Sequence, residues 1–188
     1  MNKKIYLLPL LMLALVFASC EETKEASRYD DWKARGENFI DSIAGVAAAQ
    51  DENTPAAERI YAVLDQANRV NVYYKKNLAP EYVATSQEPV LYTDSVVTFY
   101  RMTYFNGDKV QENFAGVNPG PTDQPAGFRV NEVISGWTWA LQAMKQGERW
   151  TLYIPWECAY GSGTGPNQDL QPYSALVYDV MLVKVVSD

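Results

Sequence analysis

Two short segments, Val133–Trp137 and Tyr153–Gly161, constrain the fold and function of this chain most strongly. The first reads VISGW and the second YIPWECAYG. An apolar pair, a glycine suited to a tight turn, a large indole and a second aromatic before another glycine favour an apolar pocket. Neither segment resembles a nucleophile paired with a general base or a set of metal ligands. The pattern therefore predicts an aromatic binding pocket.

The composition excludes several classes of function. The 188 residues suffice for one domain with a real core plus an appendage. The net charge is -7, from 16 basic and 23 acidic residues, which is unsuited to nucleic acid. The chain has no histidine, so Ser-His-Asp and Cys-His catalysis are excluded and a zinc site is disfavoured. We expect no metal and no cofactor, and we find no paired acidic motif.

The N-terminus has the pattern of a bacterial lipoprotein signal at residues 1–19. Two lysines, Lys3 and Lys4, precede the almost wholly apolar stretch Ile5–Phe17. This stretch is too short to favour a spanning helix. Small residues then lead to Cys20 in the sequence VFASC, which resembles a lipobox without its usual leading leucine. We expect Cys20 to be acylated and to anchor the protein. The alternative is an ordinary secreted protein cleaved near Ala18.

The other cysteine, Cys158, has no partner within the chain once Cys20 is acylated. A buried free thiol is the expected state. A catalytic thiol is disfavoured because the chain has no histidine to activate it.

A helix is predicted over Asp30–Gln50, where Trp32, Phe39, Ile43 and Val46 form one apolar stripe. Gly36 and Gly45 weaken it. The stripe is expected to pack on the main domain, and a dimer interface is the alternative reading.

The rest of the chain shows a series of strand signals with one late helix. The late helix is predicted over Trp137–Met144, and Asn106-Gly107 indicates a hairpin turn. Loops are expected at Gly116–Gly127 and Tyr160–Gln171, and Ile60–Leu64 is compatible with either a helix or a strand. The strands are expected at Val70–Lys75, Val90–Phe105, Asp108–Asn113, Phe128–Val130, Trp150–Ile154 and Ala175–Val186.

From about Asn71 to Val186 the chain resembles the FKBP-type peptidyl-prolyl cis-trans isomerases. The resemblance rests on VISGW, on the AYG at Ala159–Gly161 and on the LVYDV at Leu176–Val180, with a helix between. It implies an α+β fold in which an antiparallel sheet of about five strands wraps around one short helix. We expect a tether and helical extension at residues 20–69 and the isomerase domain at 70–188.

The resemblance also implies a set of site residues. Trp137 would lie under the prolyl ring, and the Ile134 N–H would donate to a peptide carbonyl. Tyr160 would reach a substrate carbonyl from the rim. Tyr100 and Tyr178 match family aromatics, with Tyr178 standing where Phe is usual. The expected catalytic residues are Tyr100, Trp137 and Tyr160, and the expected substrate-binding residues are Val110, Gln111, Val133, Ile134, Leu170 and Tyr178.

Departures from the family pattern concern the wall of the pocket. A Phe-Asp pair follows the hairpin in the family, and this chain has Val110 and Gln111. Phe114 is a candidate to replace the missing ring. A further family aromatic aligns with Ala126 or with nothing. These changes affect the expected catalytic rate more than the fold.

Three functions are compatible with these features. The leading prediction is a lipid-anchored prolyl isomerase, with chaperone activity in protein folding, acting on proline-containing segments of secreted or envelope proteins with an apolar residue before the proline. The second is a catalytically weak binding module. The third is a structural lipoprotein that self-associates through the helix at Asp30–Gln50. For the leading prediction we expect the bacterial envelope, at the outer membrane, facing the periplasm or the exterior.

Overall fold

The computed structural model describes residues 28–187. Every element below belongs to the compact unit that starts at Asp31. The expected signal peptide at residues 1–19 and the lipidation site Cys20 lie outside the described residues. Within the described part, no helix is long and apolar enough to cross a membrane.

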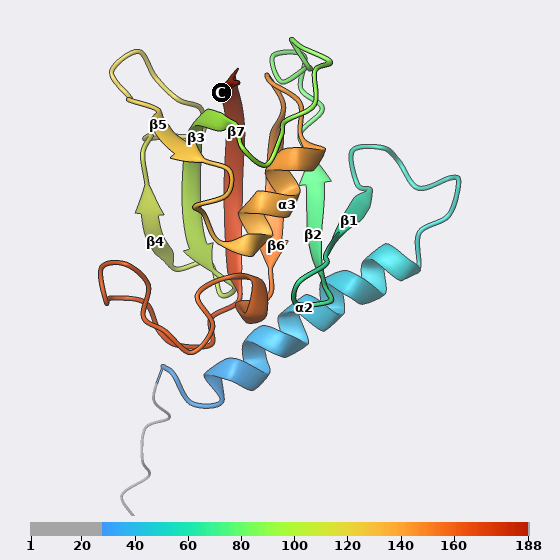
Figure 1. Cartoon of the computed structure of the whole chain (residues 1–188). Helices are drawn as coiled ribbons and strands as arrows, with labels where there is room; N and C mark the ends of the chain where they lie inside the picture. The colour runs from blue at the N-terminus through green and yellow to red at the C-terminus, as the bar shows by residue number, and fades with distance from the viewer. Residues whose placement is uncertain (1–27, 188) are drawn as a thin grey trace, which may run out of the picture. The chain divides into compact units, whose positions relative to one another are not determined.

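One antiparallel sheet organises this unit (Figure 1). Six of its seven strands follow the order β1-β2-β6-β7-β3-β4, and the seventh, β5, pairs with β3 off this path. The α+β architecture predicted from the sequence is confirmed, with seven strands instead of about five. The strands are β1 (Ile60–Asp65), β2 (Val70–Lys76), β3 (Ser95–Tyr104), β4 (Lys109–Glu112), β5 (Ala126–Arg129), β6 (Arg149–Ile154) and β7 (Leu176–Val186).

The core lies between this sheet and the short helix α3 (Ser135–Ala143). Alternate residues of β3 and β7 are buried, because successive side chains of a strand point to opposite faces. Helix α3 covers this buried face (Figure 1). It begins at Ser135, two residues before the predicted start at Trp137. The fully buried core side chains include Val96, Leu141, Met144, Leu152, Ile154, Val180 and Leu182.

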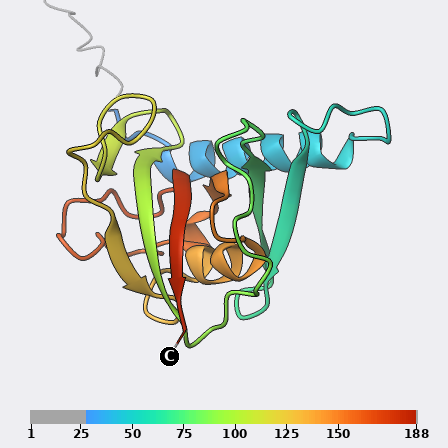
Figure 2. The ribbon, with the colours of Figure 1, turned by 90° about the horizontal axis from the view of Figure 1, so that it is seen from above.

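Helix α2 (Trp32–Ala48) confirms the predicted N-terminal helix and packs on the sheet unit through its first half. Trp32, Gly36 and Ile40 are buried, and the backbone at Gly36 approaches Ala175 so closely that an added Cβ would lie 3.3 Å from the Ala175 Cβ. The predicted stripe is only partly correct, since Val46 at its far end is 54% exposed. Figure 2 shows α2 and α3 as separate helices that cover different parts of the sheet.

The β1–β2 hairpin extends the sheet ahead of residue 70, where the isomerase domain was expected to start. Ile60–Leu64, compatible with helix or strand from the sequence, lies in β1, and β1 pairs with β2 from Ile60↔Lys75 to Asp65↔Val70. The sheet therefore starts at Ile60.

Gly136 permits the close approach of α3 to β6. A Cβ added there would lie 2.6 Å from Ile154 Cγ2 and 3.0 Å from the Cys158 backbone oxygen. We expect Gly136→Ala to destabilise the fold by about 1–3 kcal/mol, because overpacking forces a buried side chain or the backbone to shift. Urea denaturation measures this.

Gly45 of α2 is the matched control, because a Cβ there would meet nothing within 4 Å. Gly45→Ala should stabilise by about 0.5–1 kcal/mol through helix propensity. Equal effects of the two substitutions would contradict the close packing inferred at Gly136.

Candidate functional site

A cavity of about 300 Å³ opens beside the first turn of α3. Exposed side chains, Glu132 and Pro166, belong to its lining, so the cavity reaches the surface. Seven of the lining residues are among those that the sequence singled out. The full lining is Tyr100, Gln111, Phe128, Glu132, Val133, Ile134, Trp137, Tyr160, Pro166 and Tyr178.

Two predicted residues, Val110 and Leu170, do not line this cavity. They line a smaller neighbouring cavity of about 40 Å³. The two cavities adjoin, because Gln111, Tyr160 and Pro166 line both. The nine predicted site residues therefore lie in one region, with Val110 and Leu170 at its margin.

Trp137 is the centre of an aromatic cluster in the cavity. Its ring packs edge-on against Tyr178, Phe128 and Tyr100, with centroid distances of 5.2, 5.5 and 5.6 Å. Edge-to-face packing is the favoured geometry of aromatic rings. The indole is 4% exposed, and its Nε1 finds no hydrogen-bond partner among the described residues. The ring thus presents an apolar surface to the cavity.

Phe128 is a cavity residue that the sequence comparison did not find. The alignment placed Ala126 or nothing at the corresponding family aromatic. In the structure Phe128 pairs with Val96 across the sheet and packs against Tyr100 and Trp137. The signal available in the sequence was the apolar Val130 two residues later, because residues two apart in an extended segment lie on one face.

Phe114 does not replace the missing family phenylalanine. It is 4% exposed, and its ring packs against Phe99, with the Arg101 guanidinium 4.6 Å from the ring centroid. Phe99 and Arg101 alternate with Tyr100 along β3, so they lie on the opposite face of the sheet. The cavity wall near Val110 therefore lacks this aromatic ring.

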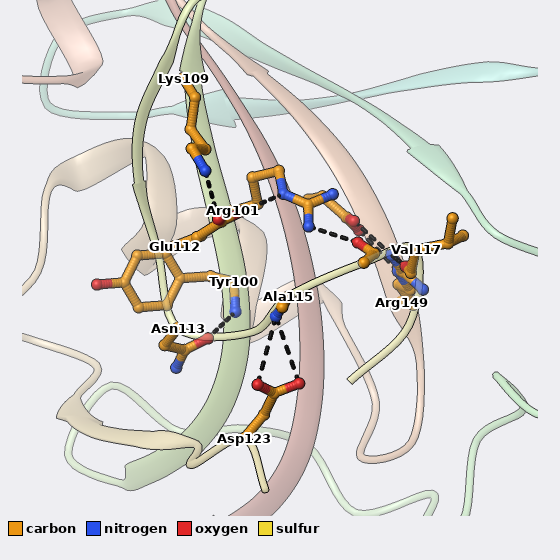
Figure 3. A network of polar contacts seen from close by, with 11 residues as sticks. Tyr100, Arg101, Lys109, Glu112, Asn113, Ala115, Val117, Asp123 and Arg149 are labelled. Carbon is orange, nitrogen blue, oxygen red and sulfur yellow. Dashed lines mark hydrogen bonds and ion pairs between the residues drawn. The ribbon is translucent and has the colours of Figure 1, made fainter. Parts of the chain in front are cut away.

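The β3–β4 hairpin brings Gln111 to the cavity through its register. Met102 pairs with Gln111, and Arg101 pairs with Glu112. Arg101 and Lys109 both bind the Glu112 carboxylate, at 2.7 and 2.6 Å (Figure 3). Glu112 and its pairing partner Arg101 lie on the opposite face of the hairpin from Gln111, since neighbouring residues alternate.

Asn113 fastens the end of the hairpin to β3. Its side chain accepts a hydrogen bond from the Tyr100 N–H at 2.8 Å (Figure 3) and donates one to the Thr98 carbonyl at 3.0 Å. This connection holds the backbone of Tyr100 in place at the cavity.

The cavity offers neutral hydrogen-bond donors. Burial, together with Tyr160 nearby, raises the pKa of Tyr178 well above the usual tyrosine value. The same causes raise the pKa of Tyr100. Both phenols therefore stay protonated at neutral pH. The Ile134 N–H makes no hydrogen bond within residues 28–187, although the Ile134 carbonyl accepts from Trp137 and Thr138 at the start of α3.

A protein-family model for FKBP-type peptidyl-prolyl cis-trans isomerases matches residues 86–183, slightly more than half of the chain. The chain belongs to this family. The matched span contains every residue that lines the two cavities.

Relatives of this FKBP-type chain are found among curated proteins and solved structures. It is 52% identical over 62 residues to the macrophage infectivity potentiator of Trypanosoma cruzi, covering 33% of this chain and 31% of that protein. It is 36% identical over 93 residues to FkpA, an FKBP-type isomerase of Escherichia coli, covering 50% and 32%. A peptidyl-prolyl cis-trans isomerase of Pseudomonas syringae pv. tomato superposes with a TM-score of 0.56 at 26% identity, covering 85% of this chain and 96% of that one. The alignments thus span about a third of the curated relatives' lengths.

Cys158 is a buried free thiol in this FKBP-type domain, as the sequence indicated. Burial, with a smaller effect of Asp65, raises the pKa of its thiol to about 12. The thiol is therefore protonated at neutral pH and unsuited to nucleophilic attack.

Asp65 binds α3, the helix that carries Trp137, and nothing in the sequence indicated this role. Its carboxylate is fully buried and accepts hydrogen bonds from the Trp139 Nε1–H of α3 at 3.1 Å and from Asn68 Nδ2 at 2.9 Å. Burial would raise the pKa of Asp65, but hydrogen bonds from Ser135 and Asn68 outweigh it and lower the pKa to about 2. Asp65 thus connects the β1–β2 turn to α3.

We expect the stability of the domain to depend on the charge of Asp65. Because the pKa of Asp65 is lowered from 3.8 to about 2, its charged carboxylate contributes about 2 kcal/mol to the free energy of unfolding. This contribution is complete above pH 3.8 and is lost as the pH falls through 2. Asp65→Asn should be less stable at pH 7, and the difference from wild type should shrink between pH 4 and pH 2. Urea denaturation across this range measures it.

Glu52→Gln changes an exposed carboxylate and serves as the control. It should shift stability at pH 7 by less than about 0.5 kcal/mol. A wild-type advantage over Asp65→Asn that stays constant from pH 7 to pH 2 would contradict the role of the Asp65 charge.

Proposed function

We propose that this protein is a peptidyl-prolyl cis-trans isomerase whose catalytic site is the cavity beside α3. Its substrates would be Xaa-Pro bonds in extended segments of secreted or envelope proteins, with no cofactor. The observation that carries the proposal is the Ile134 N–H, which makes no hydrogen bond within residues 28–187, at the edge of an aromatic cavity with Trp137 in its lining. The family membership supports it.

The chemistry requires no covalent intermediate. Rotation about an X–Pro bond faces a barrier of about 18–20 kcal/mol, because the amide resists loss of its double-bond character. A catalyst must bind the twisted amide better than either planar form. The twisted amide has less charge separation between nitrogen and oxygen, so a water-poor apolar site favours it.

Each residue of the proposed site has a part in this selection. Trp137 would support the prolyl ring, with Tyr100, Phe128 and Tyr178 as walls. The Ile134 N–H would hold a peptide carbonyl beside the proline. The Tyr160 hydroxyl would donate to a second carbonyl from the rim. None of these groups has to change its protonation state during rotation.

We expect Trp137→Leu to lower kcat/KM for a short proline peptide about 10- to 100-fold, because it removes apolar contact worth about 1.5–3 kcal/mol. Tyr160→Phe should lower it about 2- to 10-fold through loss of one hydrogen bond. The measurement is the rate of cis-trans exchange by NMR on a peptide with Leu before the proline, with thermal melting to confirm folding.

Tyr92→Phe is the control for Tyr160→Phe, because Tyr92 is 55% exposed and lines neither cavity. It should match wild type. An exchange rate for wild type equal to that of peptide alone would refute the enzymatic proposal.

A binding module is the second candidate function, and one observation favours it. The wall near Val110 lacks the family's aromatic ring, and Phe114 packs on the opposite face of the sheet. A cavity open on this side would hold a peptide with less exclusion of water. Peptide binding without acceleration in the same exchange experiment would select this function over catalysis.

We propose further that Cys20 is acylated and anchors the protein at the outer membrane of a bacterial envelope. The support is the sequence alone, in which Lys3, Lys4 and an apolar stretch precede small residues and Cys20. Acyl chains supply membrane affinity through their buried methylenes.

Expression in a bacterium that processes lipoproteins tests the anchor. The wild-type chain should incorporate labelled palmitate and fractionate with membranes, and Cys20→Ala should lose both properties. Cys158→Ala, at the second cysteine, should retain both. Unlabelled wild-type protein released in soluble form would instead indicate an ordinary secretory signal.

A further inference from the structure

The side chains that line the candidate site and carry a formal charge are all acidic. Among the residues that line the two adjoining cavities, the ionisable carboxylates are Glu132 and Asp169, and no Lys or Arg is present. Both acidic side chains are exposed, and neither has a hydrogen bond or an ion pair with its carboxylate within residues 28–187. The cavity lining therefore carries two negative charges that form no direct ion pair with any residue of 28–187.

Basic residues near the site are directed elsewhere. Arg101 and Lys109 both bind the carboxylate of Glu112 (Figure 3). Arg149 binds Asp179, with Nη2 at 2.5 Å from Oδ2. Arg129 follows the cavity residue Phe128 in β5, so its side chain leaves the strand on the other face. None of these cations lines either cavity.

The two carboxylates lie where a bound chain would pass. Glu132 precedes Val133 and the unpaired Ile134 N–H, which is the proposed anchor for a peptide carbonyl. Asp169 lies beside Leu170 in the segment that also contributes Pro166 to both cavities. A chain held at Ile134 with its proline on Trp137 would bring neighbouring side chains near Glu132, and on the side of the smaller cavity near Asp169.

We infer that the site selects proline segments in which Lys or Arg flanks the Xaa-Pro pair, and disfavours Asp or Glu at the same positions. Glu132 and Asp169 are the residues that set this preference. The inference rests on the proposed peptide site and specifies its substrate class. The net charge of -7 acts in the same direction, because it attracts cationic chains at a distance.

The test uses the full chain and three blocked peptides of equal length, in which the residues flanking a Leu-Pro pair are both Lys, both Gln or both Glu. Binding is measured by isothermal titration and exchange by NMR, at low salt and at about 0.5 M salt, where the Debye length is only a few ångströms. At low salt the affinity should follow Lys over Gln over Glu, by about two- to fivefold per carboxylate engaged.

The variants identify the groups responsible. Glu132→Gln and Asp169→Asn should each reduce the affinity advantage of the Lys peptide, and the double variant should bind the three peptides with similar affinities. High salt should likewise make the affinities of wild type for the three peptides similar. Glu81→Gln is the matched control, because Glu81 is exposed and lines neither cavity. This variant should retain the wild-type order of affinities for the three peptides at low salt.

The inference would be overturned if wild type bound the three peptides with equal affinity, or if it bound none of them. An order that persists in the double variant would overturn the assignment to Glu132 and Asp169. Failure of catalysis is separate: if the Gln peptide binds but exchanges no faster than in buffer, the enzymatic proposal fails, and the order of affinities still decides the inference.

Discussion

The contact of α3 with the sheet at Gly136 is the constraint on which the site depends. Because residue 136 has no side chain, the first turn of the helix lies against Ile154 and the Cys158 backbone. This places Trp137, the next residue, among Tyr100, Phe128 and Tyr178. The short segment VISGW therefore supplies the wall, the free N–H group, the close approach and the indole within five consecutive residues.

The elements predicted from the sequence are those with strong periodicity or distinctive residues. The alternating β3 and β7 and the helix beginning near Trp137 follow directly from the side-chain pattern. The site residues in VISGW and AYG were predicted because a family pattern fixes their spacing. Their positions in one cavity agree with that pattern. Their catalytic roles are still predictions.

Other features depend on tertiary packing that the sequence does not express. Phe128 was missed because the loop before it is rich in glycine and proline, which gives no register to count from. Phe114 could be assigned to the cavity or to the opposite face only once the hairpin register was known. Asp65 resembles any acidic residue before a turn, and its importance comes from Trp139, which is distant in sequence.

Two side-chain hydrogen bonds join α2 to segments near the mouth of the cavity, so a force on the helix would be transmitted to those segments. Trp32 donates to Ser174 at 2.9 Å, just after the loop that carries Pro166 and Leu170, and Trp156 donates to Glu37 at 3.0 Å. A tensile load entering the chain ahead of Trp32 would act on Ser174 through this hydrogen bond and on Tyr104 of β3 through the edge-on contact of the Trp32 ring. The segments at the mouth of the cavity would therefore share with the end of β3 any force applied from the N-terminal side.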